Sequence, residues 1–186
     1  ARHMPLAMYR DWKVEFLARA LRQHGVAAEI QPLITVPEHS RRRATFNARR
    51  EGGVMRIGYH GRRSHDLVAA DDCPVLDARI VALLPALAEL AAVVAAGDEA
   101  TRVAVTITDT GADIDVEGSE KGLTARVRSR ISEIAATARM ARVSVGQVPV
   151  IVRQAPVLHF AGKAVTPPPG VFLQAVPEAE QAMIDL

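Results

Sequence analysis

The single cysteine of this 186-residue chain is followed directly by a proline, and this pair is the first candidate for chemistry. Cys73 and Pro74 close a run that begins with Ser64, His65 and Asp66. A cysteine followed by proline ends the ligand pattern of some iron–sulfur proteins. One thiolate cannot hold such a cluster, so a ligand role for Cys73 requires partners outside this chain. The alternative is a lone thiol that packs as a small hydrophobic side chain.

Arginines are the second candidate. The chain carries 23 basic residues but a formal net charge of only +2. Only three of the basic residues are lysines, and eight arginines fall between Arg41 and Arg63. The planar guanidinium suits phosphate recognition and base stacking better than an ammonium does. This cluster predicts a surface that faces nucleic acid. The alternative is a solvated strand face whose arginines pair with acidic neighbours such as Glu38 and Glu51.

Composition excludes several classes of protein. The length suits one medium domain, or one domain and a fragment of another. One cysteine excludes a disulfide scaffold and fits a reducing compartment. The sequence has no apolar run of roughly 18 residues that would predict a membrane span. The first residues do not show the charged and then apolar pattern of a signal peptide. We therefore expect a cytoplasmic protein with no membrane association.

Hydrophobic periodicity and turn residues predict hairpins that alternate with helices. Helices are expected over residues 6–24, from the N-cap Asp77 to about residue 96 with a kink or break at Pro85, over residues 120–141, and from Pro177 onward. Strand pairs are expected at 40–49 with 54–60, 102–108 with 112–116, 143–145 with 148–152, and 157–160 with 164–165. Residues 26–36 are expected to be an edge strand or an irregular segment. This pattern predicts an α+β domain with a largely antiparallel sheet and about three helices.

The end of the chain has a different character. Residues 166–170 read Thr-Pro-Pro-Pro-Gly, which predicts a stiff connector. The helix expected after it carries Met183, Ile184 and Leu186, so its apolar side continues to the last residue. An apolar helix that stops there predicts that the chain is a piece of a longer protein.

Taken in order, four segments resemble the RNA uracil-5-methyltransferases, the family of bacterial tRNA and ribosomal RNA m5U enzymes. The resemblance covers the whole chain in order, although the residues between 76 and 155 contribute little. The matching segments are residues 1–4 with Tyr9-Arg10-Asp11-Trp12-Lys13, the arginine-rich run 40–46, Arg63-Ser64-His65-Asp66-Leu67-Val68 with Asp72-Cys73-Pro74, and Pro169-Gly170-Val171-Phe172-Leu173-Gln174.

The resemblance implies a parent protein of three parts. A β-barrel RNA-binding domain with three cluster cysteines would lie upstream, residues 1–166 would be the central domain, and residues 167–186 would open a Rossmann-like methyltransferase domain. Cys73 would be the fourth ligand of a [4Fe-4S] cluster, and Gln174 would contact S-adenosylmethionine. The residues expected on or near the RNA-facing surface are Arg41, Arg42, Arg43 and His65. Val176 stands where many relatives have asparagine, which weakens the case for further polar contacts beside Gln174.

The implied activity is transfer of a methyl group from S-adenosylmethionine to C5 of a uridine, in ribosomal RNA rather than tRNA. In this family a cysteine thiolate adds to C6 and a glutamate removes the C5 proton. Neither residue matches a position in this chain, so we expect the fragment alone to be inactive, with neither cluster nor S-adenosylmethionine bound. RNA is the expected partner, and no obligate protein partner is evident. The alternative is a free-standing, non-enzymatic RNA-binding module that uses the hairpin between Arg41 and Arg63.

Overall fold

The computed structural model describes residues 4–95, 97 and 99–185, and the chain divides into two compact units, Ala1–Thr35 and Val36–Leu186. Residues 1–3, which form part of the family resemblance, lie outside the described residues. So do residue 96, the expected end of the second helix, and Leu186. The proposed division of the chain at residue 166 rests on the family resemblance and stays a prediction.

The first unit contains one helix, α1 (Leu6–Gln23), as the apolar periodicity predicted. The helix ends before Gly25, whose φ of 68° is easily adopted only by glycine. Trp12 and Phe16 contact each other along one side, with ring centroids 5.7 Å apart. The segment after the helix is irregular rather than a strand, which agrees with the second of the two expectations for residues 26–36.

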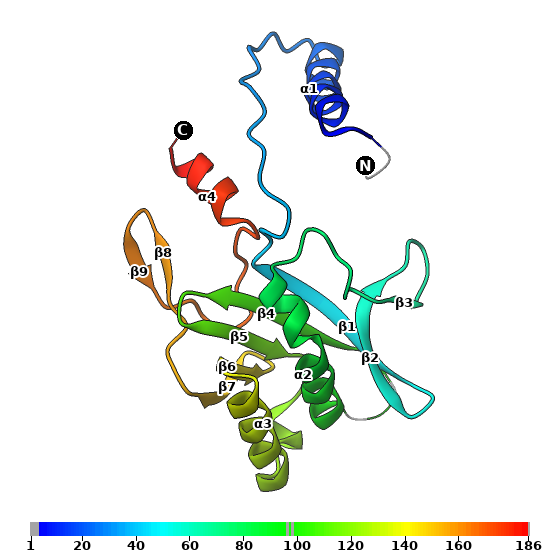
Figure 1. The fold of residues 1–186 in the computed structure, drawn as a ribbon, viewed down its shortest axis with the longest axis vertical. Helices are drawn as coiled ribbons and strands as arrows, with labels where there is room; N and C mark the ends of the chain where they lie inside the picture. The colour runs from blue at the N-terminus through cyan, green and yellow to red at the C-terminus, as the bar shows by residue number, and fades with distance from the viewer. Residues whose placement is uncertain (1–3, 96, 98, 186) are drawn as a thin grey trace. The chain divides into compact units, whose positions relative to one another are not determined.

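The second unit is built on a mixed sheet (Figure 1). Its seven strands lie in the order β3-β2-β1-β4-β5-β6-β7, and every neighbouring pair is antiparallel except β5 and β6. The bounds are β1 Arg43–Glu51, β2 Val54–His60, β3 Leu67–Val68, β4 Thr101–Thr108, β5 Gly111–Val116, β6 Met140–Val145 and β7 Val148–Val152. A separate hairpin is formed by β8 (Leu158–Phe160) and β9 (Lys163–Val165). The predicted α+β class is confirmed.

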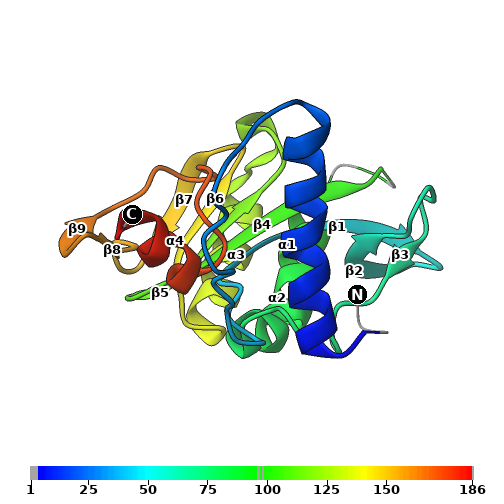
Figure 2. The ribbon, with the colours of Figure 1, turned by 90° about the horizontal axis from the view of Figure 1, so that it is seen from above.

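Two helices, α2 (Ala78–Val94) and α3 (Ala125–Thr137), pack against one face of this sheet (Figures 1 and 2). A short 3₁₀ turn, Glu120–Gly122, precedes α3, and the last helix is α4 (Pro177–Ile184). The core under α2 and α3 is aliphatic with one aromatic ring, and its fully buried side chains include Phe46, Leu87, Val105, Ile114 and Ile131. Since strand residues alternate between faces, the intervening residues of β1 and β4 lie on the opposite face, which we call the uncovered face.

One local prediction was wrong, one was wrong in one of its two alternatives, and one short strand was not predicted. The helix expected over residues 120–141 ends at Thr137, because Met140 and Ala141 begin β6 and pair in the sheet. Of the kink or break expected at Pro85, the break is wrong, because α2 runs on through this residue; the kink stays a prediction. Pro85 is exposed, while Leu84 and Leu87 are buried in the core. The two-residue strand β3 was not expected, since it is too short to show a period.

No helix in the described part of the chain is both long and apolar enough to cross a membrane.

Candidate nucleic-acid interface

The arginine run at residues 41–43 leads into β1. Strand alternation sends Ala44 and Phe46 into the core and places Arg43 on the uncovered face of the sheet. The Arg43 guanidinium lies over the ring of Phe172, 5.7 Å from its centroid. Arg41 precedes the strand, and its side chain is exposed. Both side chains can therefore present positive charge at the beginning of β1.

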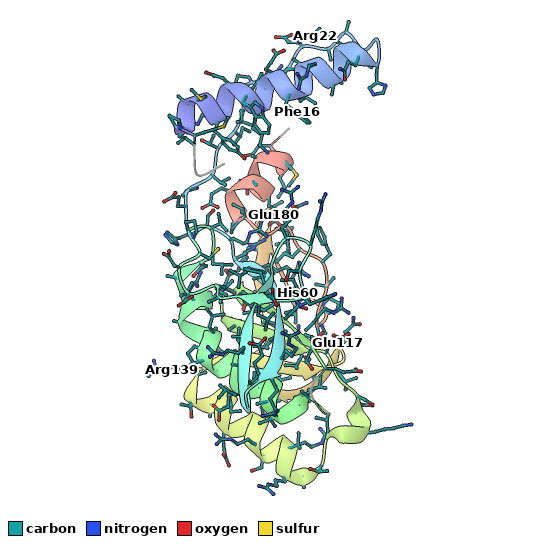
Figure 3. All side chains as sticks on the ribbon, turned by 90° about the vertical axis from the view of Figure 1, so that its right-hand side faces the viewer. Phe16, Arg22, His60, Glu117, Arg139 and Glu180 are labelled. Carbon is teal, nitrogen blue, oxygen red and sulfur yellow. The ribbon has the colours of Figure 1, made fainter. Side chains whose placement is uncertain are left out.

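Arg42 differs from its two neighbours. It is 8% exposed, and its Nη2 donates to both carboxylate oxygens of Glu180 on α4, at 3.1 and 3.0 Å (Figure 3 labels Glu180). Its backbone N–H donates to the carbonyl of Ala175 at 2.7 Å. The side chain thus holds α4 against the beginning of β1 rather than offering a free cation to solvent. The predicted contact between Arg42 and RNA stays a prediction.

The loop that carries Cys73 is bound to the same end of β1. The backbone N–H of His39 donates to the carbonyl oxygen of Pro74 at 2.8 Å. The backbone N–H of Arg41 donates to the carbonyl oxygen of Val75 at 2.9 Å, and the carbonyl oxygen of Arg41 accepts from the backbone N–H of Asp77 at 3.0 Å.

Cys73 itself is half-buried against the core. It lies near Tyr59, whose phenol pKa is raised mainly by burial and secondarily by Cys73, while Arg41 lowers it.

A four-thiolate cluster does not fit the residues of this chain by themselves. The chain has one cysteine, and the described residues include no group of three or more His, Cys, Asp or Glu placed to hold a metal ion. The chain can supply at most one of the four ligands that such a cluster needs. The ligand role of Cys73 stays a prediction.

Gln174 lies on the connector between β9 and α4. Leu173 is buried and Gln174 is exposed, so the backbone at this point is fixed while the amide remains accessible. The next residue, Ala175, accepts the hydrogen bond from Arg42. Three segments that are far apart in the sequence therefore meet at the beginning of β1: residues 41–43, the Cys73 loop and the connector that carries Gln174.

His65 lies at the other end of the Cys73 loop, in the turn after β2. Its exposed ring stands edge-on to that of His60, with centroids 5.8 Å apart (Figure 3 labels His60). The turn is held by the Ser64 hydroxyl, which donates to the Asp66 carboxylate at 2.7 Å. Arg62 and Arg63 are exposed in the same turn. A role for His65 at the RNA-facing surface stays a prediction.

The sequence reasoning missed a polar cavity on the uncovered face. The cavity has a volume of about 390 Å³, and its walls include Arg43, Arg102, Asp115, Glu117, Gln147 and Gly170. The alternation of apolar and polar residues along the strands expected at 102–108 and 112–116 assigns Arg102 and Asp115 each to the polar side of its own strand. No local pattern, however, could show that the connector passes over that face and closes the cavity with Gly170.

Comparisons with known proteins agree with the family resemblance. A protein of Caulobacter vibrioides named "Uncharacterized RNA methyltransferase" is 40% identical over 190 residues, which cover 99% of this chain and 46% of that protein. A protein of Rhizobium meliloti named "Uncharacterized RNA methyltransferase R00878" is 36% identical over 184 residues, which cover 99% of this chain and 44% of that protein. The "23S rRNA (uracil(1939)-C(5))-methyltransferase RlmD" of Halomonas elongata is 38% identical over 91 residues, which cover 47% of this chain and 17% of that enzyme. Over nearly its whole length the chain is similar to proteins named RNA methyltransferases.

The chain spans less than half the length of the RNA methyltransferases that match it along nearly its whole sequence. No protein-family model matches it. These matches confirm the predicted resemblance.

Proposed function

We propose that this chain is the central part of an S-adenosylmethionine-dependent RNA methyltransferase that methylates C5 of a uridine, in ribosomal RNA rather than tRNA. The observation that carries this proposal is the match, over 99% of the chain, to bacterial proteins named RNA methyltransferases. The match to a 23S rRNA uracil-C5 enzyme over 47% of the chain supports the base, the position and the RNA class. A cytoplasmic location belongs to the same proposal.

The geometry at the beginning of β1 supports a division of labour. Arg41 and Arg43 would contact RNA phosphates, and Gln174 would contact S-adenosylmethionine. Cys73 would complete a [4Fe-4S] cluster with cysteines from another part of the full protein. The hydrogen bond from Arg42 to Ala175 would fix the distance between the RNA contacts and the cofactor contact. The cluster would thus act as a structural element that holds the Cys73 loop.

The RNA-binding part of this proposal can be tested on the 186-residue chain. We would measure binding of a fluorescent oligouridylate at several KCl concentrations. Each phosphate contact contributes roughly 0.7 to the slope of log affinity against log salt for single-stranded RNA. A surface making about three contacts should give a slope near −2. Arg41→Ala should reduce the magnitude of this slope by roughly 0.7.

Arg126→Ala is the matched control. Arg126 is exposed on α3, a helix that covers the opposite face of the sheet, and its loss changes the net charge by the same amount. The control should leave the slope unchanged. Equal slopes for Arg41→Ala and Arg126→Ala would show that the arginine run at the beginning of β1 does not contact RNA.

A further inference from the structure

The cavity on the uncovered face contains one carboxylate that has no ionic partner. Glu117, at the rim, pairs with Arg102, whose Nη2 lies 3.1 Å from the carboxylate (Figure 3 labels Glu117). Asp113, on the same strand as Asp115, is buried and pairs with Arg142 at 2.7 Å. Asp115 itself makes no ion pair with any described residue. Within the described part of the chain, its hydrogen bond comes from the backbone N–H of Gln147, which donates to Oδ1 at 2.9 Å.

The second oxygen of Asp115 faces Gly170 of the connector. A Cβ atom at Gly170 would lie 2.8 Å from Oδ2 of Asp115, closer than van der Waals contact allows. Gly170 also has a φ of 67°, which favours glycine. The glycine therefore lets the connector pass close to the carboxylate, and Asp115 and Gly170 both line the cavity. Among the described residues, none donates a hydrogen bond to Oδ2, so the carboxylate keeps acceptor capacity at the cavity wall.

A half-buried carboxylate in a polar cavity selects ligands by the arrangement of their donors. An ionised carboxylate only accepts hydrogen bonds. Among the RNA bases, guanine alone presents two adjacent N–H donors, N1–H and N2–H, on its Watson–Crick edge. Adenine and cytosine place a ring acceptor beside their amino group, and uracil places a carbonyl on each side of N3–H. Unpaired bases are commonly recognised on this edge by proteins that bind single-stranded RNA.

The size and charge of the cavity fit the same ligand. A volume of about 390 Å³ lies at the lower end of the range for small-molecule sites. Arg43 and Arg102 supply guanidinium groups at its wall, and arginine both stacks on bases and binds phosphate. We propose that this cavity binds a guanine base of single-stranded RNA, with the Asp115 carboxylate accepting hydrogen bonds from N1–H and N2–H. This inference rests on the proposed function, since it assigns a base contact to the same RNA substrate.

The test uses mononucleotides, so it does not depend on the phosphate contact proposed for Arg41. We would titrate the ¹⁵N-labelled chain with GMP, IMP, AMP and UMP and follow the amide signals of Gln147 and Gly170 by NMR. GMP should bind roughly tenfold more tightly than AMP or UMP, as expected for two hydrogen bonds to a charged group. IMP lacks the 2-amino group and should fall between them.

Asp115→Asn is the decisive variant, because it keeps the shape and can keep the acceptor for the Gln147 N–H while turning Oδ2 into a donor. It should abolish the preference for GMP. Glu117→Gln is the control: it removes a charge from the same cavity but from a side chain already engaged by Arg102. It should retain the preference. Amide spectra that match the wild type outside the cavity would show that both variants are folded.

Equal affinity of the wild-type chain for all four nucleotides would overturn the inference, and so would an unchanged GMP preference in Asp115→Asn. The two proposals can fail separately. Salt-dependent oligouridylate binding without any GMP preference would reject the guanine site alone. A GMP preference without an effect of Arg41→Ala would reject the proposed phosphate contacts alone.

Discussion

Arg42 and Glu180 illustrate how a single residue pair links distant parts of the chain. Both side chains are nearly buried, at 10% and 13% exposure, and the guanidinium donates to both carboxylate oxygens. Removing one partner of such a pair leaves an uncompensated charge, which costs far more than losing an exposed ion pair. The pair therefore stabilises the docking of α4 on the sheet, and through α4 it fixes the connector that carries Gln174.

We expect Arg42→Ala to lower the free energy of unfolding by about 3 kcal/mol, the lower end of the range for breaking a buried pair. Arg43→Ala, whose side chain is only half-buried, should cost less than about 1 kcal/mol, since an exposed cation–π contact contributes little. Urea denaturation of both variants measures this difference. A similar cost for the two variants would mean that the Arg42–Glu180 pair does not stabilise the fold.

The sequence could not separate the three arginines at residues 41–43. They are identical in type and adjacent, and each was predicted to face RNA. Only the contact with Glu180, which lies 138 residues away, distinguishes Arg42. The sequence could not predict the position of Asp115 at a cavity either, because that position depends on where the connector passes. By contrast, the position of Cys73 beside a proline is visible in the sequence, and the structure places its loop at the beginning of β1.

At the scale of elements, local chemistry determined most of the strands and helices. The turn Gly52–Gly53, with both residues at positive φ, joins β1 and β2 as predicted. The helix after Thr124 was overestimated, because its apolar spacing continues into residues that tertiary contacts place in β6. Strand pairing between β5 and β6 is a long-range contact, which helical periodicity alone cannot report.

The beginning of α2 allows a prediction about pH. The Asp77 carboxylate accepts from the backbone N–H of Arg79 at 2.9 Å and from its side-chain Nη2 at 2.6 Å. The pKa of the Asp77 carboxyl lies below its ordinary value of 3.8, and the largest cause is the hydrogen bond from the Arg79 side chain. The folded state therefore binds this proton less readily than the unfolded state, so the stabilisation is present above pH 3.8 and is lost as the pH falls through the lowered pKa.

Asp77→Asn keeps the cap acceptor and removes the charge, so it isolates this effect. The stability difference between wild type and Asp77→Asn should be largest near neutral pH and should shrink as the pH falls from about 5 toward the lowered pKa. Asp77→Ala should cost about 1 kcal/mol more at neutral pH because it also removes the cap. Thermal unfolding of the wild type and of both variants between pH 3 and pH 7 measures these stability differences. A difference that is independent of pH would show that the charge of Asp77 does not contribute.

At the scale of the molecule, the net charge of +2 conceals an uneven distribution. Eight arginines fall within residues 41–63, on the first hairpin and the turn after it. The sheet holds this hairpin beside the Cys73 loop and the connector, so that one end of β1 joins the three segments to which the family resemblance assigns roles. The sequence predicted these segments individually, whereas their meeting point follows only from the strand order and from the path of the connector.

We propose that the complete protein methylates C5 of uridine in RNA. The most direct measurement is to incubate that protein, encoded by the whole gene, with 23S rRNA and isotopically labelled S-adenosylmethionine, and to analyse the digested nucleosides by mass spectrometry. We expect labelled 5-methyluridine, with a lower yield from Arg41→Ala than from Arg126→Ala. Label in a different nucleoside, or no label from a folded protein with its cofactors bound, would contradict it.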